Sequence, residues 1–145
     1  MPLILRKEKM ETTKLFNIAE QEGITVDFLS LCENIALSVE LDGKGFIALD
    51  KRLVGRTAAE RVALAHELGH LATGATHTVG ASAGQVQKSE QAAHRWAIET
   101  LVPFGELIAA IKSGEENPTE LAERFTVTEE FMVKALHFYR ETKSA

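Results

Sequence analysis

The pentapeptide His66-Glu-Leu-Gly-His70 constrains this chain more than any other stretch of its sequence. Side chains four residues apart lie on one face of a helix, so the imidazoles of His66 and His70 can bind a single metal ion. The residues around them make the helix apolar on most of its circumference, which predicts that it is buried between other elements: Val62, Leu64, Ala65, Leu68, Gly69, Leu71 and Ala72. Unpaired polar groups in such a place cost roughly 2–7 kcal/mol each, a cost that a metal would remove. The alternative is a helix whose histidines hydrogen-bond to neighbouring backbone.

Signals at both ends support this helix. Thr57-Ala-Ala-Glu60 has the form of a capping box, and Gly74 can adopt the left-handed conformation that ends a helix. The sequence therefore predicts a helix of about four turns.

Zinc suits this pattern, because neutral imidazoles bind it well and a catalytic zinc site has three protein ligands and one open position. The metal lowers the pKa of a bound water to roughly 7, and Glu67 beside it could take the water proton. Candidates for the third ligand lie downstream. His77 is one position away from the place that the metzincin zinc proteases require, which makes it the weaker candidate.

Glu90 is the stronger candidate for the third ligand. It begins a second helical run that ends at Pro103, and small residues at Ala93 and Ala97 would let this helix approach the first closely. His94 follows one turn later, where it could orient a metal-bound imidazole. The alternative for Glu90 is a solvated charge near a helix N-terminus, where acids are favoured.

These motifs, together with Trp96-Ala97 and the Leu101-Val-Pro103 ending, resemble the ImmA/IrrE-type metallopeptidases of phages and mobile elements. The order of the predicted elements matches over most of the chain. The resemblance implies that His66, His70 and Glu90 bind Zn2+ and that Glu67 activates water. It also implies a protein substrate, a helix-turn-helix DNA-binding repressor whose cleavage switches on the genes it silences. The family usually has Asn or Asp where this chain has His94.

Composition is consistent with one small intracellular enzyme. The chain has 145 residues, enough for one core, and its single cysteine, Cys32, excludes an internal disulfide. We find no signal peptide and no apolar run that could span a membrane, and therefore expect a cytoplasmic protein. The net charge of −5 argues against general binding to nucleic acid but permits a basic protein partner.

The pattern of elements predicts a single α+β domain over residues 1–145, mainly helical and zincin-like, with a small antiparallel sheet. Residues 1–56 are expected to form an N-terminal helix (11–21), a short strand (24–28) and a hairpin of strands 35–41 and 46–49 around an Asp42-Gly43 turn. Alternating apolar residues predict that strand 35–41 is half-buried: Ile35, Leu37, Val39 and Leu41. Residues 57–103 carry the two ligand helices, with a loop over 73–82 that could cover the cleft. By analogy with other zinc peptidases, the hairpin could hold a substrate as an added strand.

Residues 104–145 are expected to form a short helix opened by Pro103 and then a helix-turn-helix-like segment whose helices are capped by Asn117 and Thr128. From Glu115 onward, seven acids against four bases leave this segment net negative by three, which favours packing or partner recognition over DNA binding. Tyr139 and His137 are read as core or surface residues. The leading hypothesis is therefore a zinc endopeptidase, and the alternative is a non-catalytic antirepressor that binds a repressor on the same scaffold.

Overall fold

The computed structural model describes residues 3–74, 81–115 and 117–143, with side chains from residue 12 onward. Within them the chain forms six α-helices and three strands, as expected for a mainly helical α+β domain. None of the described helices is long and apolar enough to cross a membrane. The predicted loop at 73–82 falls largely outside the described residues.

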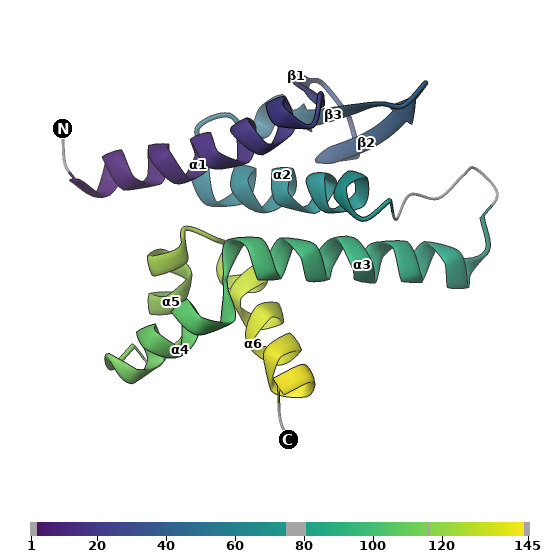
Figure 1. Cartoon of the computed structure of the whole chain (residues 1–145). Coiled ribbons are helices and arrows are strands. Elements are labelled where there is room, and N and C mark those ends of the chain that lie inside the picture. The colour runs from purple at the N-terminus through teal and green to yellow at the C-terminus, as the bar shows by residue number, and fades with distance from the viewer. Residues whose placement is uncertain (1–2, 75–80, 116, 144–145) are drawn as a thin grey trace.

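Helix α2 (Thr57–Ala72) lies at the centre of the molecule, between α1 (Leu3–Gln21) with the sheet on one side and α3 (Ala83–Leu101) on the other (Figure 1). Its Leu64, Ala65 and Leu68 are at most 1% exposed, which confirms that it is a buried helix. The remaining helices, α4 (Phe104–Lys112), α5 (Pro118–Phe125) and α6 (Glu129–Lys143), pack beneath the end of α3 (Figure 1).

The prediction of where α2 ends is correct, but the prediction of how it begins is not. Gly74 adopts φ +67° directly after the Thr73 C-cap, as expected for a left-handed residue that ends a helix. The prediction of a capping box at Thr57 is wrong, because the helix already includes Thr57. Its N-cap is Arg56, which makes no side-chain cap hydrogen bond. The first turn is instead held through backbone, where the Glu60 amide donates to the Arg56 carbonyl at 2.8 Å.

The sheet has the strand order β1-β3-β2, formed by β1 (Thr25–Leu29), β2 (Ala36–Leu41) and β3 (Lys44–Asp50). Strands β2 and β3 form the predicted antiparallel hairpin, with Asp42 and Gly43 both at positive φ in the two-residue turn. The sheet as a whole is mixed where an antiparallel one was expected, because β1 lies on the other edge of β3 and runs parallel to it.

Strand β2 is less buried than its alternating pattern predicts. Ile35 just before it is 56% exposed, and Val39 and Leu41 within it are 41% and 71% exposed. Exposure rises along the strand instead of alternating, because β2 is an edge strand whose turn end extends beyond α2 (Figure 1). An edge strand has no sheet neighbour on one side, so its apolar side chains are covered only where a helix reaches them.

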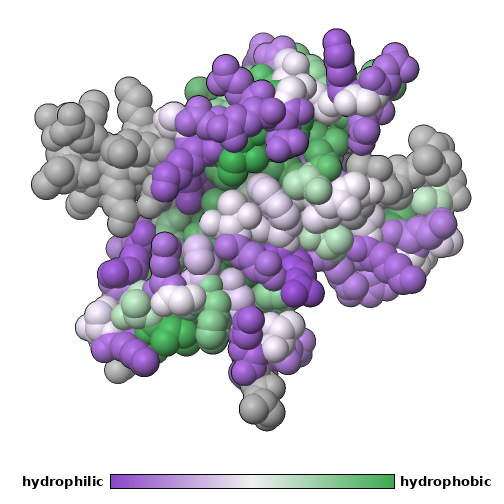
Figure 2. Space-filling view, in the orientation of Figure 1, coloured by the Kyte–Doolittle hydropathy of each residue, from purple (hydrophilic) through white to green (hydrophobic). Residues whose placement is uncertain are grey.

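The C-terminal helices agree with their predicted caps. The Asn117 side chain accepts from the Glu120 amide at 2.9 Å, and the Thr128 hydroxyl accepts from the Phe131 amide at 3.1 Å. Between them, Thr126 ends α5 in the left-handed conformation. The surface of this region mixes apolar and charged residues, seen as green among purple at the lower left of Figure 2. The exposed large apolar residues of α4 are Phe104 and Ile111.

Candidate metal centre

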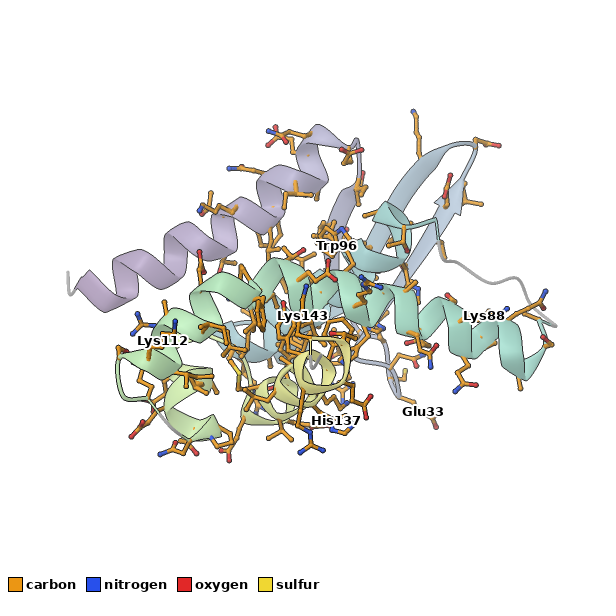
Figure 3. All side chains as sticks on the ribbon, turned by 60° about the horizontal axis from the view of Figure 1, so that its bottom comes forward. Glu33, Lys88, Trp96, Lys112, His137 and Lys143 are labelled. Atoms are coloured by element: carbon orange, nitrogen blue, oxygen red, sulfur yellow. The ribbon has the colours of Figure 1, made fainter. Side chains whose placement is uncertain are left out.

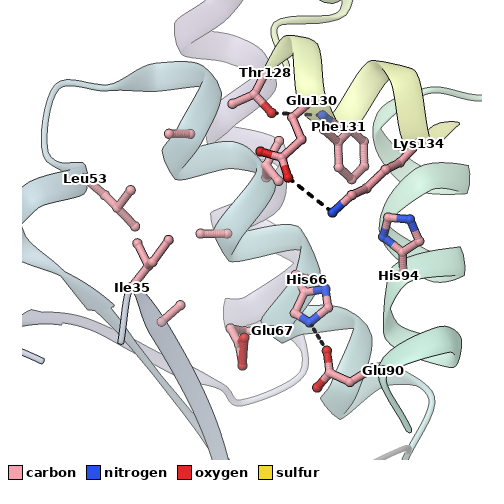
Figure 4. Close-up of a pocket in the computed structure, with 14 residues that line it drawn as sticks. Ile35, Leu53, His66, Glu67, Glu90, His94, Thr128, Glu130, Phe131 and Lys134 are labelled. Atoms are coloured by element: carbon pink, nitrogen blue, oxygen red, sulfur yellow. Dashed lines mark hydrogen bonds and ion pairs between the residues drawn. The ribbon is translucent and has the colours of Figure 1, made fainter. Parts of the chain in front are cut away.

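His66 and His70 lie one turn apart on α2, and the Nε2 atom of each ring lies within 3.0 Å of the Glu90 carboxylate on α3. Figure 4 shows His66 beside Glu90. Their rings meet edge to face, with centroids 4.9 Å apart. The His70 side chain is 8% exposed and that of His66 is 28% exposed, so one imidazole is enclosed and the other faces the cleft.

Glu90 on α3 completes this group. Its Oε2 atom lies 2.9 Å from Nε2 of His66, and its Oε1 atom lies 3.0 Å from Nε2 of His70. One possible ligand atom from each of the three residues lies within 4.8 Å of the other two. Among the described residues, this is the group of His, Cys, Asp or Glu side chains that could hold a metal ion. Two imidazoles and one carboxylate are a donor set that zinc accepts, so these residues fit a metal ion.

Glu90 owes its position to the close contact of α2 with α3. Gly69 lies against Ala93, and a Cβ atom added to Gly69 would lie only 2.5 Å from the Ala93 carbonyl oxygen. Ala93 and Ala97 are fully buried, as expected from their small size. The sequence reading identified the small residues on α3 but missed that Gly69, inside the pentapeptide, is their counterpart.

The start of α3 also differs from the prediction. The helix begins at Ala83, where Ser82 and Gln85 form a capping box, and not at Glu90. Glu90 therefore lies well inside the helix, which rules out the reading that it is an acid placed at a helix N-terminus. Ser82 and Gln85 have the spacing that could have revealed this start.

Ser89 is a site residue that the sequence reading missed. Its side chain is buried, and its Oγ atom lies 3.2 Å from Nδ1 of His70, on the side of the ring opposite Glu90. When Nε2 of His70 presents its lone pair to a metal, the ring proton is on Nδ1 and can be donated to Ser89. The position next to Glu90 on the same helix was the signal that could have found it.

Glu67 follows His66 and lines the cleft that opens beside the metal-ligand group (Figure 4). Its side chain is mostly enclosed, with the whole residue 8% exposed. The cleft has a volume of about 530 Å3 and lies between α2, the start of β2 and the first turns of α6. Apart from Glu67, the wall on this side is apolar and includes Ile35, Leu53, Ala59 and Val62.

His94 also faces this cleft, one turn after Glu90 on α3 (Figure 4). Its ring stands edge to face on Phe131 of α6, with centroids 6.0 Å apart. Burial lowers the pKa of His94 below its usual value, and Lys134 and His66 lower it further against an opposing effect of Glu90. Ser89 is an outer partner of His70. The expected role of His94 in orienting a metal-bound imidazole stays a prediction.

The other candidates lie away from the cleft or outside the described residues. His77, the alternative third ligand, belongs to the stretch that the structure does not describe. Tyr139 is buried and donates to the Val102 carbonyl at 2.7 Å, as expected for a core residue. His137 lies on the outer side of α6 (Figure 3), where it pairs with Glu141 at 3.0 Å.

Comparison with known proteins gives one family. The model of a peptidase family, described as the IrrE N-terminal-like domain, matches residues 19–137. The match covers most of the chain and includes α2, α3 and the whole cleft. No curated protein matches the chain.

Proposed function

The chain belongs to the peptidase family of IrrE N-terminal-like domains, a family of metallopeptidase-like proteins. From this premise we propose that it is a zinc-dependent endopeptidase that hydrolyses a peptide bond in a regulatory protein. His66, His70 and Glu90 are the proposed zinc ligands, and Glu67 is the proposed general base.

One observation carries this proposal. Two imidazole nitrogens and a carboxylate from two different helices meet within 4.8 Å, next to a cleft lined by a further carboxylate, that of Glu67. Zinc peptidases need these parts, namely three protein ligands, an open side and a base within reach of the attacking water. The family match supports the reaction class, and the geometry supports the choice of residues.

The residues divide the work of hydrolysis as follows. A zinc ion at the three ligands would lower the pKa of a bound water and polarise the peptide carbonyl. Glu67 would take a proton from the attacking water as the water oxygen adds to the carbonyl carbon. It then passes the proton to the amide nitrogen while the C–N bond breaks, so that a carboxyl group and an amine are released. Ser89 holds the His70 ring in position throughout.

The proposed substrate is a DNA-binding repressor of the helix-turn-helix type. The resemblance noted from the sequence supports this choice, and so does the net charge of −5, which favours approach by a basic protein. A cytoplasmic site of action follows from this substrate. Strand β2 is an edge strand, and Ile35 and Ala36 at its start line the cleft, so an extended segment of the substrate could add to it there.

The first test is the zinc content of the purified chain, compared with Glu90→Ala and with Glu99→Ala as a control on the same helix. Glu99 pairs with Arg95 at 2.8 Å on the surface, so its loss removes a carboxylate of α3 without touching the centre. We expect about one zinc per chain in the wild type and in Glu99→Ala, and a large loss in Glu90→Ala. Wild-type protein that stays free of metal after zinc is supplied would contradict the proposal.

The second test is cleavage. Zinc-loaded wild type and Glu67→Gln are incubated with a lysate of the cells that encode the chain, and newly formed protein N-termini are identified by mass spectrometry. Loss of a general base lowers the rate by about 10²–10⁴-fold, so Glu67→Gln should keep its zinc and produce almost no new N-termini. A partner that both proteins bind and leave intact would instead favour the non-catalytic antirepressor.

A further inference from the structure

Hydrolysis of a peptide bond places a negative charge on the carbonyl oxygen, and a donor fixed near that oxygen accelerates the reaction strongly. Among the described residues that line the cleft, three side chains other than the metal-ligand group carry N–H or O–H donors: His94, Thr128 and Lys134. They differ in their distance from the centre and in their existing partners.

Thr128 and Lys134 are the weaker candidates. Thr128 caps α6 through its contact with the Phe131 amide and lies at the end of the cleft away from Glu90 (Figure 4). Lys134 pairs with Glu130 at 3.5 Å, and its side chain is 57% exposed, so its charge is shared with a carboxylate and with solvent.

His94 has the position that such a donor needs. It follows Glu90 by four residues on α3, so the two side chains leave the helix on one face about one turn apart. Figure 4 shows its ring between Lys134 and the pair of His66 and Glu90, facing into the cleft. The edge-to-face contact with Phe131 holds the ring from the side of α6.

The His94 ring is also in a protonation state that suits a hydrogen-bond donor. Burial and the nearby charge of Lys134 lower the pKa of His94, which favours the neutral imidazole at neutral pH. A neutral imidazole keeps one N–H to donate and carries no charge that would compete with zinc for Glu90. It therefore can donate a hydrogen bond without first gaining a proton.

We propose that His94 is a catalytic residue whose ring N–H donates a hydrogen bond to the carbonyl oxygen of the substrate as that oxygen becomes an anion. The inference rests on the proposed peptidase function and adds to it the group that stabilises the oxyanion. No proton is transferred to or from His94 in this step; the hydrogen bond shortens as the negative charge develops and lengthens again when the C–N bond breaks.

The test uses the full-length, zinc-loaded chain and three variants. His94→Phe keeps a ring against Phe131 and removes both nitrogens, whereas His94→Gln keeps an N–H donor of similar reach. His137→Phe makes the same change on the outer side of α6, 60% exposed and paired with Glu141, as a matched control. Zinc content and thermal unfolding of each variant are measured first, and we expect all three to match the wild type in zinc content.

Cleavage of the protein identified by its new N-termini is then measured under single-turnover conditions. We expect His94→Phe to lower the rate of the chemical step by about 10²–10³-fold with little change in the half-saturating concentration, and His94→Gln to keep at least a tenth of the wild-type rate. A rate for His94→Phe within threefold of the wild type overturns the proposal. So does a loss of rate in a fourth variant, Lys134→Met, that His94→Phe does not share.

Binding of a tetrahedral anion gives a readout that does not depend on turnover. The probe is N-phosphoryl-Leu-Trp, whose phosphoryl group imitates the tetrahedral intermediate, compared with the planar hydroxamate of the same dipeptide. We expect His94→Phe to bind the phosphoryl compound at least tenfold more weakly than the wild type does. The affinity for the hydroxamate should change much less. Equal affinity of wild type and His94→Phe for the phosphoryl compound, including no measurable binding by either, overturns the proposal.

The two proposals fail in different ways. A wild type that binds zinc and cleaves its target, with His94→Phe equally active, refutes the role of His94 and leaves the peptidase intact. A wild type that binds no zinc or cleaves nothing refutes the peptidase function itself.

Discussion

Ser89 and Glu90 are adjacent in the chain and act on opposite sides of the His70 ring. Glu90 lies 3.0 Å from Nε2, and Ser89 lies 3.2 Å from Nδ1. Outer partners of this kind fix the orientation and the proton position of a metal-binding imidazole. At the scale of single residues, we therefore expect the proposed centre to depend on a hydroxyl group that binds no metal itself.

The role of Ser89 predicts the effect of its removal. Ser89→Ala should lower zinc affinity by about 10–100-fold, because His70 loses a hydrogen-bond partner that holds its ring. Competition against a chromophoric chelator measures the affinity. Ser113→Ala, at the end of α4 and away from the centre, is the control and should leave the affinity unchanged. An unchanged affinity in Ser89→Ala would show that the hydroxyl does not support the centre.

At the scale of elements, the contact between α2 and α3 brings Glu90, the third proposed ligand, to His66 and His70. Two effects oppose each other at Gly69. Alanine is favoured over glycine inside a helix by about 1 kcal/mol, but its Cβ would meet the Ala93 carbonyl at 2.5 Å. Backbone cannot move aside as a flexible side chain can, so the steric effect wins.

Gly69→Ala should therefore separate the two helices, lower the melting temperature and weaken zinc binding at least tenfold. Gly105→Ala is the matched control: Gly105 also lies in a helix, and nothing is within 4 Å of an added Cβ. It should leave zinc affinity unchanged and hold or raise the melting temperature. Equal zinc affinity in the two variants would mean that Gly69 is not needed for the approach of α3.

The end of β3 is a second case in which one side chain joins several elements. The buried carboxylate of Asp50 accepts from the Leu31 amide, the Arg52 amide and the Arg52 guanidinium at 2.7–2.8 Å. It thereby caps the short 3-10 helix Lys51–Leu53 and holds the loop that follows β1. These hydrogen bonds, with that to the Arg52 side chain first, keep the pKa of Asp50 well below its usual value of 3.8.

This shift predicts how stability depends on acid. The unfolded chain takes up a proton at Asp50 near pH 4, while the folded chain does so only at lower pH, so stability falls as pH decreases below about 4. Asp50→Asn should be less stable than the wild type at pH 7 and should lose less stability on acidification. Urea unfolding at pH 7 and at pH 3 measures both. A parallel fall in the two proteins would contradict a role for this carboxylate.

At the scale of the whole molecule, the C-terminal helices complete the cleft that α2 and α3 begin. Thr128, Phe131 and Lys134 of α6 form one of its walls. Arg61, buried on α2, connects the two parts, since its Nε donates to the Thr126 carbonyl at 2.9 Å and its Nη2 to the Phe125 carbonyl at 3.4 Å. The helix that carries two of the proposed zinc ligands thus also holds the turn from which α6 begins.

Arg61→Met should preserve the length of the side chain and remove these hydrogen bonds. We expect the free energy of unfolding to fall by about 1–3 kcal/mol, because buried carbonyl groups lose a charged donor. Each kcal/mol lowers the melting temperature of a chain of this size by about 2–4 °C, which calorimetry resolves. Zinc stoichiometry should stay at one, because none of the proposed ligands contacts the turn. A loss of zinc in Arg61→Met would contradict the expectation that this turn and the metal centre are independent.

The chain's own sequence determined the features that depend on near neighbours. The spacing of His66 and His70, the left-handed Gly74, the Asp42-Gly43 turn and the caps at Asn117 and Thr128 all follow from interactions within a few residues, and the structure has each of them. The sequence pattern also predicted which glutamate meets the two histidines, since small residues mark the face of α3 that contacts α2.

Tertiary structure alone decided the features that depend on distant segments. The parallel pairing of β1 with β3 and the exposure of Val39 and Leu41 depend on which strand lies beside which, and alternation within one strand carries no such information. The contact of Ser89 with His70 and the place of His94 opposite α6 likewise arise only when helices far apart in the chain pack together. Local geometry repeats with the period of a helix or strand, whereas packing depends on side chains that meet only in the folded molecule.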